Sequence, residues 1–134
     1  MKSSRVIIPK EVSNQLDFHA LVPGKLPKGY SMDKNSIKSD SGLLFFNIKS
    51  GDGATISFSE QQVPSSFNVD KFYNKQIDGL HFSTPLGRGA AGDFGKQKIG
   101  TLISNNGVWV VINNTSADIS QAELESLIRN IKIL

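Results

Sequence analysis

The C-terminal part of the chain constrains the fold most, because residues 99–134 follow the pattern of a strand, a turn, a strand, a loop and a helix. Residues 99–104 and 108–114 are apolar, carry little charge and contain several β-branched side chains, which is typical of strands buried on at least one face. An Asn-Asn-Gly sequence separates them, and Asn-Gly tolerates the positive φ angles of a tight turn. We therefore predict a β-hairpin in which Trp109, the largest side chain, packs in the core.

The residues after the hairpin predict an amphipathic helix. Ser120 and Glu123 have the spacing of a capping box, in which each side chain accepts a hydrogen bond from the backbone amide of the other residue. Ile119, just before the cap, is placed to pack against Leu124. Apolar residues then recur at i, i+3, i+4 and i+7, as Leu124, Leu127, Ile128 and Ile131. We predict that this stripe lies on the sheet.

Strand patterns recur in the middle of the chain. Residues 16–22 and 54–59 alternate apolar and polar side chains, as half-buried strands do. Residues 43–48 are densely apolar and predict a buried strand. Residues 80–84 predict a short strand that ends at Pro85.

A second helix is predicted for residues 68–77, with Asn68 as its N-cap and Gly79 as a left-handed cap at its end. Residues 1–15 are polar and show no sustained period, which indicates a tail or tether. We predict one α+β domain over residues 16–134. Its fold is a curved antiparallel sheet of about five to seven strands with two main helices packed on it.

Composition excludes several classes of protein. The chain has 134 residues, which favours one domain with a substantial core. It contains no cysteine, and this excludes disulfides, thiol catalysis and cysteine-metal sites. The net charge of +3 includes no basic run and no aromatic-interleaved patch, so nucleic acid is not expected as a partner. No apolar run approaches the roughly 18 residues that a transmembrane helix needs.

One glycine-rich motif invites a functional interpretation. Residues 87–92, Gly-Arg-Gly-Ala-Ala-Gly, match the GxGxxG spacing of dinucleotide-binding loops. That motif needs a preceding strand and a helix that opens from it, because the helix N-terminus holds the pyrophosphate. Here Pro85 precedes the motif, and no helix start follows it. We therefore interpret residues 87–95 as a glycine-rich loop, whose amides and Arg88 can at most bind an anion.

No other group of residues has the spacing of a catalytic, cofactor or metal site. His19 and His81 each fall in a predicted strand on the face opposite the apolar neighbours, which is typical of solvent-facing histidines. No spacing supplies carboxylate partners for a zinc ion. Glu123 and Glu125 are explained by the capping and solvation of their helix. We therefore predict that the chain is not an enzyme, with no catalytic residue, no cofactor and no bound metal.

Two adjacent phenylalanines bear on a binding surface. Phe45 and Phe46 follow one another in a predicted strand, so their side chains point to opposite faces of the sheet. If one face is uncovered, one of the two rings can line a binding groove. The alternative is that a helix covers each face.

Several short motifs resemble a bacterial domain family. Residues 18–23, Phe-His-Ala-Leu-Val-Pro, followed by Leu-Pro-Lys-Gly-Tyr at residues 26–30, resemble its "Pro…Leu-Pro-x-Gly-Tyr" opening. The ending is similar too, with a Gly/Ala-rich turn, a hairpin that carries Trp on its second strand, and Ser-x-x-Glu before a short amphipathic helix. The resemblance spans roughly residues 16–134. The family is an extracytoplasmic domain of unknown function in membrane-anchored sigma-factor regulators and lipoproteins.

The resemblance implies an antiparallel sheet curved against helices, as in lipoprotein-carrier proteins, and a membrane anchor upstream of residue 1. The family has no established catalytic residues. These expectations favour a non-enzymatic extracytoplasmic sensing or interaction domain with an unknown protein as its partner. The alternative is a carrier that binds a lipid or other apolar ligand between the sheet and the helices. An enzyme that uses the 87–95 loop is the least favoured hypothesis.

Overall fold

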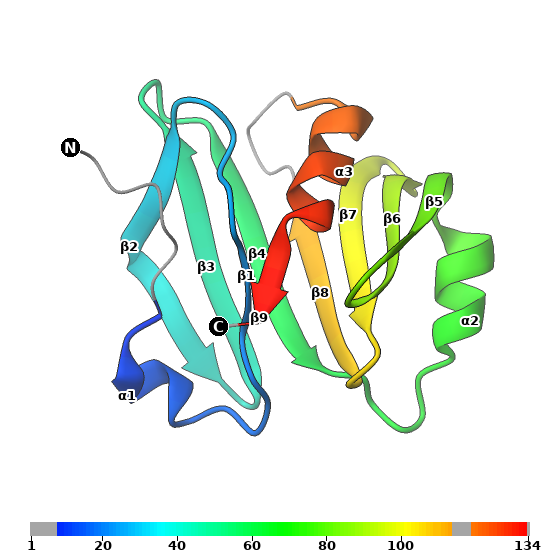
Figure 1. Cartoon of the computed structure of the whole chain (residues 1–134), viewed down its shortest axis with the longest axis horizontal. Coiled ribbons are helices and arrows are strands. Elements are labelled where there is room, and N and C mark those ends of the chain that lie inside the picture. The colour runs from blue at the N-terminus through cyan, green and yellow to red at the C-terminus, as the bar shows by residue number, and fades with distance from the viewer. Residues whose placement is uncertain (1–7, 114–118, 134) are drawn as a thin grey trace.

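The computed structural model describes residues 8–113 and 119–133, and it shows an α+β fold that consists mostly of antiparallel sheet (Figure 1). The large sheet contains β2 (Tyr30–Asp40), β3 (Leu43–Ser50), β4 (Thr55–Gln62), β5 (Asp78–Thr84), β6 (Gly87–Phe94), β7 (Gln97–Ser104) and β8 (Val108–Asn113). A small sheet pairs β1 (Leu21–Pro23) with β9 (Ile131–Ile133). The helices are α1 (Lys10–Ser13), α2 (Val69–Lys71), which continues as the π-helical turn η1 (Phe72–Gln76), and α3 (Gln121–Arg129).

Two antiparallel meanders form the large sheet. The strand order is β2-β3-β4-β8-β7-β6-β5, so β2 to β4 and β5 to β8 are each consecutive, and β4 pairs with β8 where they meet. The α+β class is confirmed. The predicted details differ, because the described residues form seven strands in one sheet and two in another, and the helices are short.

The C-terminal hairpin is confirmed, since β7 and β8 pair directly. Its turn is not the two-residue type that the Asn-Gly pair suggested. Only Gly107 has a positive φ, of 82°, while both asparagines stay at negative φ. Three residues therefore connect the strands, with glycine at the left-handed position. The Ser104 hydroxyl supports this turn by accepting the Val108 amide at 3.0 Å.

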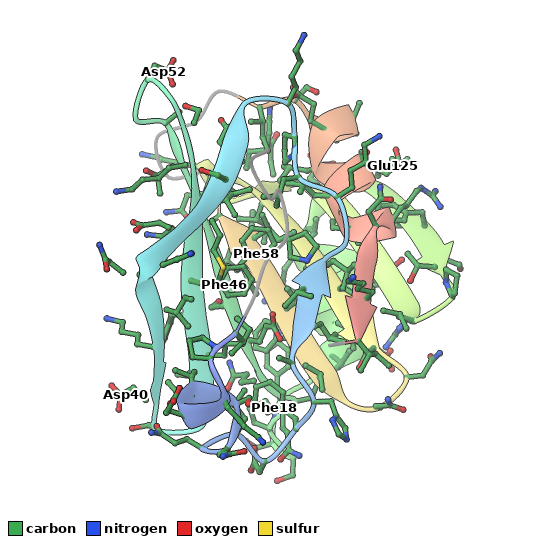
Figure 2. The ribbon with its side chains drawn as sticks, turned by 60° about the vertical axis from the view of Figure 1, so that its left-hand side comes forward. Phe18, Asp40, Phe46, Asp52, Phe58 and Glu125 are labelled. Carbon is green, nitrogen blue, oxygen red and sulfur yellow. The ribbon has the colours of Figure 1, made fainter. Side chains whose placement is uncertain are left out.

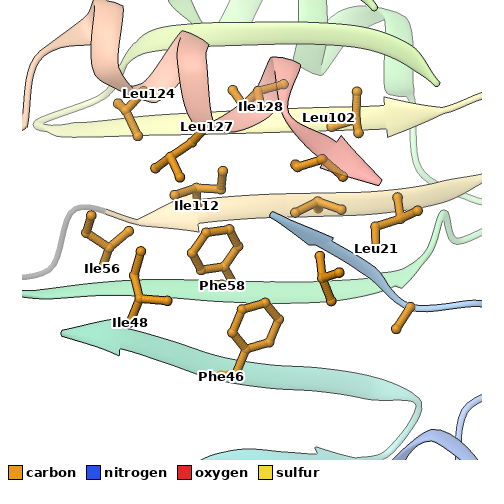
Figure 3. Close-up of a cluster of buried hydrophobic side chains, with 14 of the residues drawn as sticks. Leu21, Phe46, Ile48, Ile56, Phe58, Leu102, Ile112, Leu124, Leu127 and Ile128 are labelled. Carbon is orange, nitrogen blue, oxygen red and sulfur yellow. The ribbon is translucent and has the colours of Figure 1, made fainter. Parts of the chain in front are cut away.

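The capping box of α3 is also confirmed. The Glu123 amide donates to Ser120 Oγ at 3.1 Å, and the Ser120 amide donates to Glu123 Oε1 at 3.0 Å. Leu124, Leu127 and Ile128 point from the helix toward the sheet (Figure 3). The predicted fourth helical position, Ile131, is wrong. The helix ends at Arg129, because the chain then turns to pair β9 with β1, and Ile131 is buried as a strand residue.

The main core lies between the large sheet, α3 and the small sheet. Phe46 and Phe58 stack in it with ring centroids 4.8 Å apart, and each is 1% exposed. In Figure 2 both rings lie inside the fold, whereas Asp40, Asp52 and Glu125 lie at its periphery. Burying side chains of this size stabilises the fold by roughly 1.5–3 kcal/mol each, before the loss of conformational entropy is subtracted.

A second, smaller core lies on the opposite face of the sheet. It contains Phe72 and Tyr73 from η1 and packs against Trp109. The Trp109 ring stacks on Phe67 at 4.4 Å, and its indole N–H donates to Thr101 Oγ1 at 3.0 Å. Trp109 therefore packs in a core, but on the face opposite α3.

The glycine-rich segment 87–95 is not a loop, and that prediction is wrong. Residues Gly87–Phe94 form β6, paired on both sides with β5 and β7. Its glycines are required by close backbone contact, since a Cβ on Gly92 would lie 2.3 Å from the Asp78 carbonyl oxygen. In β7, a Cβ on Gly100 would lie 2.8 Å from Ile128 Cδ1 of α3. These small residues let α3 approach the sheet closely.

The second predicted helix is only partly correct. Asn68 caps it, accepting the Lys71 amide at 3.0 Å, but the α-helical part ends at Lys71 and a π-helical turn follows. Gly79 is not its C-cap. Strand pairing with β6 begins at Asp78, so Gly79 lies in β5.

Two N-terminal predictions also need correction. The strand predicted for residues 16–22 is limited to Leu21–Pro23, because only these residues pair with β9, and residues 16–20 form no strand. The long edge strand β2 was missed, because its polar sequence shows no regular alternation and its pairing is irregular between Asp33 and Lys38. Within the predicted tail, Ile8 is buried in the main core and Lys10–Ser13 form α1, while residues 1–7 lie outside the described residues.

Candidate functional site

The candidate site is a cleft of about 380 Å³ at one end of the large sheet. We call it the end cleft. It lies between the segment before β1, the β5–β6 turn and the β7–β8 turn. The residues that line it are Asp17, Phe18, His19, Leu21, Gln62, Pro85, Leu86, Ser104, Asn105, Asn106, Val108 and Ile133. Figure 2 shows Phe18 at this end of the molecule, opposite the end that carries Asp52.

Hydrogen bonds between distant segments hold the walls of the end cleft. The Gln62 side-chain amide donates to the Asp17 carbonyl at 3.1 Å, which ties the segment before β1 to the end of β4. The Asn105 amide donates to the Leu86 carbonyl at 2.7 Å, which joins the two turns. The Thr84 hydroxyl accepts the Leu86 amide at 3.2 Å and so fixes the β5–β6 turn. The cleft is therefore largely preformed.

The end cleft combines apolar walls with a polar rim. Leu21 and Val108 are buried at its base, while Ile133 is 45% exposed at its edge. Asn105, Asn106 and other polar residues supply hydrogen-bonding groups around these walls. Small-molecule sites in proteins have this volume and this mixture of apolar walls with a few polar groups.

A buried carboxyl group lies next to the end cleft. Glu60 Oε1 accepts the backbone amide of Leu21 at 2.8 Å, and this bond connects β1 to β4. Glu60 is 0% exposed, and its Oε2 atom has no hydrogen-bond partner among the described residues. Burial raises the pKa of Glu60 to about 8, an effect that the Leu21 amide partly opposes. The side chain is therefore mainly protonated at neutral pH.

Glu60 was missed by sequence reasoning, although a signal was present. The predicted strand ends at residue 59, just before Glu60, whereas β4 continues to Gln62. Ile56 and Phe58 are on the core face of β4, and the same alternation places Glu60 on that face too. An unpaired carboxyl inside a core is rare, because burial disfavours its charged form.

The two histidines lie in different parts of the fold. His19 lines the end cleft together with Asp17 and Ser104. Ser104 Oγ accepts the Val108 amide, and in the described residues no hydrogen bond connects it to His19. His81 lies on β5, where its Nε2 is 2.6 Å from the Tyr73 carbonyl oxygen of η1. The described residues contain no cluster of three or more potential metal-ligating side chains.

Arg88, the residue considered for anion binding, has partners within the protein. Its guanidinium lies 2.9 Å from Asp70 and 5.1 Å from the centre of the Tyr73 ring. The backbone around it pairs with strands on both sides, so its amides do not form the concave arrangement that an anion nest requires. The strand pairing therefore argues against an anion nest, which the sequence leaves open only as an alternative to a plain glycine-rich loop.

The paired phenylalanines do lie on opposite faces. Phe46 is buried in the main core, and Phe45 is half-buried on the other face, where Lys38 lies 5.7 Å from the centre of its ring. That face carries a second hollow, which Phe45 and Lys38 help to line. None of the helices in the described ranges has the length and apolar character needed to span a membrane.

Comparisons of the chain with protein-family models, curated proteins and solved structures found no match.

Proposed function

We propose that this chain is a non-enzymatic binding domain that holds an apolar group in the end cleft. The observation that carries the proposal is the cleft itself, of about 380 Å³, with apolar walls from Leu21, Leu86 and Val108 and a polar rim. Its walls come from distant segments joined by hydrogen bonds, so little ordering is needed on binding.

The favoured occupant is an apolar side chain of a protein partner, which makes the chain a sensing or interaction domain. The alternative is a carrier of a lipid or another apolar ligand. The space between α3 and the sheet is filled by side chains that are 0–1% exposed, including Ile112, Leu124 and Ile128. A carried ligand would therefore have to use the end cleft, which favours a short apolar group over an enclosed lipid.

Calorimetric titration tests the proposal with two probes, N-acetyl-leucine amide for a side chain and octanoate for an acyl chain. Ile133→Gln removes an apolar wall at a position that is 45% exposed, so the fold should persist. We expect a roughly tenfold loss of affinity for the preferred probe. The matched control is Leu80→Gln, at a 36% exposed leucine of β5, and it should bind as the parent does. Equal affinity of the two variants would reject the end cleft as the site, and preference for octanoate would favour the carrier.

We further propose that the domain acts outside the membrane. This proposal rests on the resemblance to the extracytoplasmic domain family. Because the chain has no cysteine, Ser65→Cys places a single thiol on an exposed loop. A membrane-impermeant maleimide added to intact native cells should label this variant as fully as it does after lysis. Labelling only after lysis would contradict an extracytoplasmic location.

A further inference from the structure

The outer face of the large sheet, opposite α3, carries a hollow of about 440 Å³. We call it the outer hollow. Side chains that face it come from four neighbouring strands, β2, β3, β4 and β8. One row across these strands contains Asn47, Ser57 and Asn113, and the next contains Phe45, Ser59 and Val111. All six are half-buried rather than covered.

The row of amides and hydroxyls is unusual for a strand surface. Asparagine is depleted in strands, where threonine or valine is favoured, so Asn47 and Asn113 reduce the local strand propensity. Each side-chain amide offers both donors and an acceptor. The irregularity of β2 shapes the wall, because Ser36 Oγ accepts the Asn47 backbone amide at 2.7 Å. The outer hollow is therefore suited to a ligand rich in hydroxyl groups.

The charge of the outer hollow limits the ligand further. Lys38 is the one charged side chain among the residues that line it. The neighbouring Lys49 pairs with Asp33 at 3.1 Å, whereas Lys38 forms no ion pair within the described ranges and lies over the Phe45 ring. An anionic group on the ligand would complement Lys38, and Phe45 offers an apolar surface beside it.

We propose that the outer hollow binds an acidic oligosaccharide, one that contains uronic acid units. A sugar carboxylate would pair with Lys38, a sugar ring would lie on Phe45, and hydroxyl groups would bond with Asn47 and Asn113. The distance from β2 to β8 is three strand spacings, or roughly 14 Å. The occupant is therefore an oligosaccharide rather than a monosaccharide. This site is separate from the end cleft.

Titration of ¹⁵N-labelled protein with trigalacturonate tests this inference, with maltotriose as a neutral trisaccharide of the same length. We expect amide shifts at residues of the outer hollow and an affinity for trigalacturonate about tenfold above that for maltotriose.

Lys38→Met should remove this preference for trigalacturonate over maltotriose. Asn47→Thr combined with Asn113→Thr should weaken binding of trigalacturonate by about tenfold, while threonine suits the strands. Lys71→Met, at an exposed lysine of α2, is the control and should leave the affinity unchanged.

Several results would overturn the proposal. These are equal affinity for the two trisaccharides, shifts that map to the end cleft, and unchanged binding by the double asparagine variant. Tetraglutamate that binds the outer hollow as tightly as trigalacturonate would reassign it to acidic peptides. Titration of the parent with N-acetyl-leucine amide in parallel separates this test from that of the end cleft, because the two probes should shift different amides.

Discussion

Replacing Glu60 with glutamine is expected to make stability much less dependent on pH. The free energy of unfolding of the parent protein should fall as pH rises from about 4.5 to 8, and the glutamine variant should lose most of this fall. The carboxyl is buried and has an unpaired oxygen, and burial raises its pKa from 4.5 to about 8. Over this pH range the unfolded chain releases the proton while the folded chain keeps it, so the free energy of unfolding falls as pH rises. Glutamine preserves an oxygen acceptor for Leu21 and does not titrate.

The expected effect is large. A shift of this size corresponds to a change of roughly 3–5 kcal/mol in the free energy of unfolding. The free energy of unfolding of the glutamine variant minus that of the parent should therefore be larger at pH 9 than at pH 4 by that amount. Urea denaturation at each pH measures it, with Glu11→Gln as the control at an exposed carboxylate of α1, where the change should be below about 0.5 kcal/mol. A stability difference between variant and parent that is independent of pH would show that Glu60 is not buried as a neutral acid.

Replacing Phe58 with alanine is expected to destabilise the fold strongly. The ring is 1% exposed and stacks on Phe46, in the centre of the main core. Its loss removes apolar contacts and leaves a cavity, which reduces the free energy of unfolding by roughly 3–5 kcal/mol. Chemical denaturation at a pH near 4 measures this where the Glu60 carboxyl is mainly protonated in both the folded and the unfolded chain.

Phe94→Ala is the matched control, because that ring is 39% exposed at the end of β6 and contacts Phe72 at 5.6 Å. Its effect should stay below about 1.5 kcal/mol. Equal losses in the two variants would contradict the assignment of Phe58 to the interior and of Phe94 to the surface.

The sequence predicts the C-terminal half of this fold better than the N-terminal half, for a physical reason. The β7–β8 hairpin and α3 carry local signals, namely a turn sequence, a capping box and a helical stripe. The structure confirms the hairpin, the capping box and the stripe as far as Ile128, although the turn has three residues and Ile131 lies in β9. β1 and β9 carry no such signal. They are short, and they pair with each other across more than 100 residues of chain, so tertiary contacts alone define them.

Glycine was the residue most easily misinterpreted. A run rich in glycine ordinarily indicates a turn, but in β6 and β7 these residues make room for neighbouring strands and for α3. Gly89 shows the same effect, because a Cβ there would lie 2.5 Å from the Phe82 ring. Such crowding depends on the three-dimensional arrangement of the sheet, which the local sequence does not show.

The end cleft could not be predicted from the sequence, because its walls come from segments that are distant in the chain. His19 is isolated in the sequence, and no local pattern connects it with Leu86 or Val108. Glu60 could have been found by extending the alternation of β4 by one residue. Phe45 gives a partial signal for the outer hollow, because the adjacent positions of Phe45 and Phe46 in a strand predict that the two rings point to opposite faces.

The most direct test of the central claim is an amide shift map of the ¹⁵N-labelled protein with N-acetyl-leucine amide. We predict that the largest shifts fall at Leu21, Leu86 and Val108, which come from three different segments and meet only at the end cleft. Shifts confined to another surface, or spectra that do not change up to the solubility limit of the probe, would contradict the proposal that this cleft is the binding site.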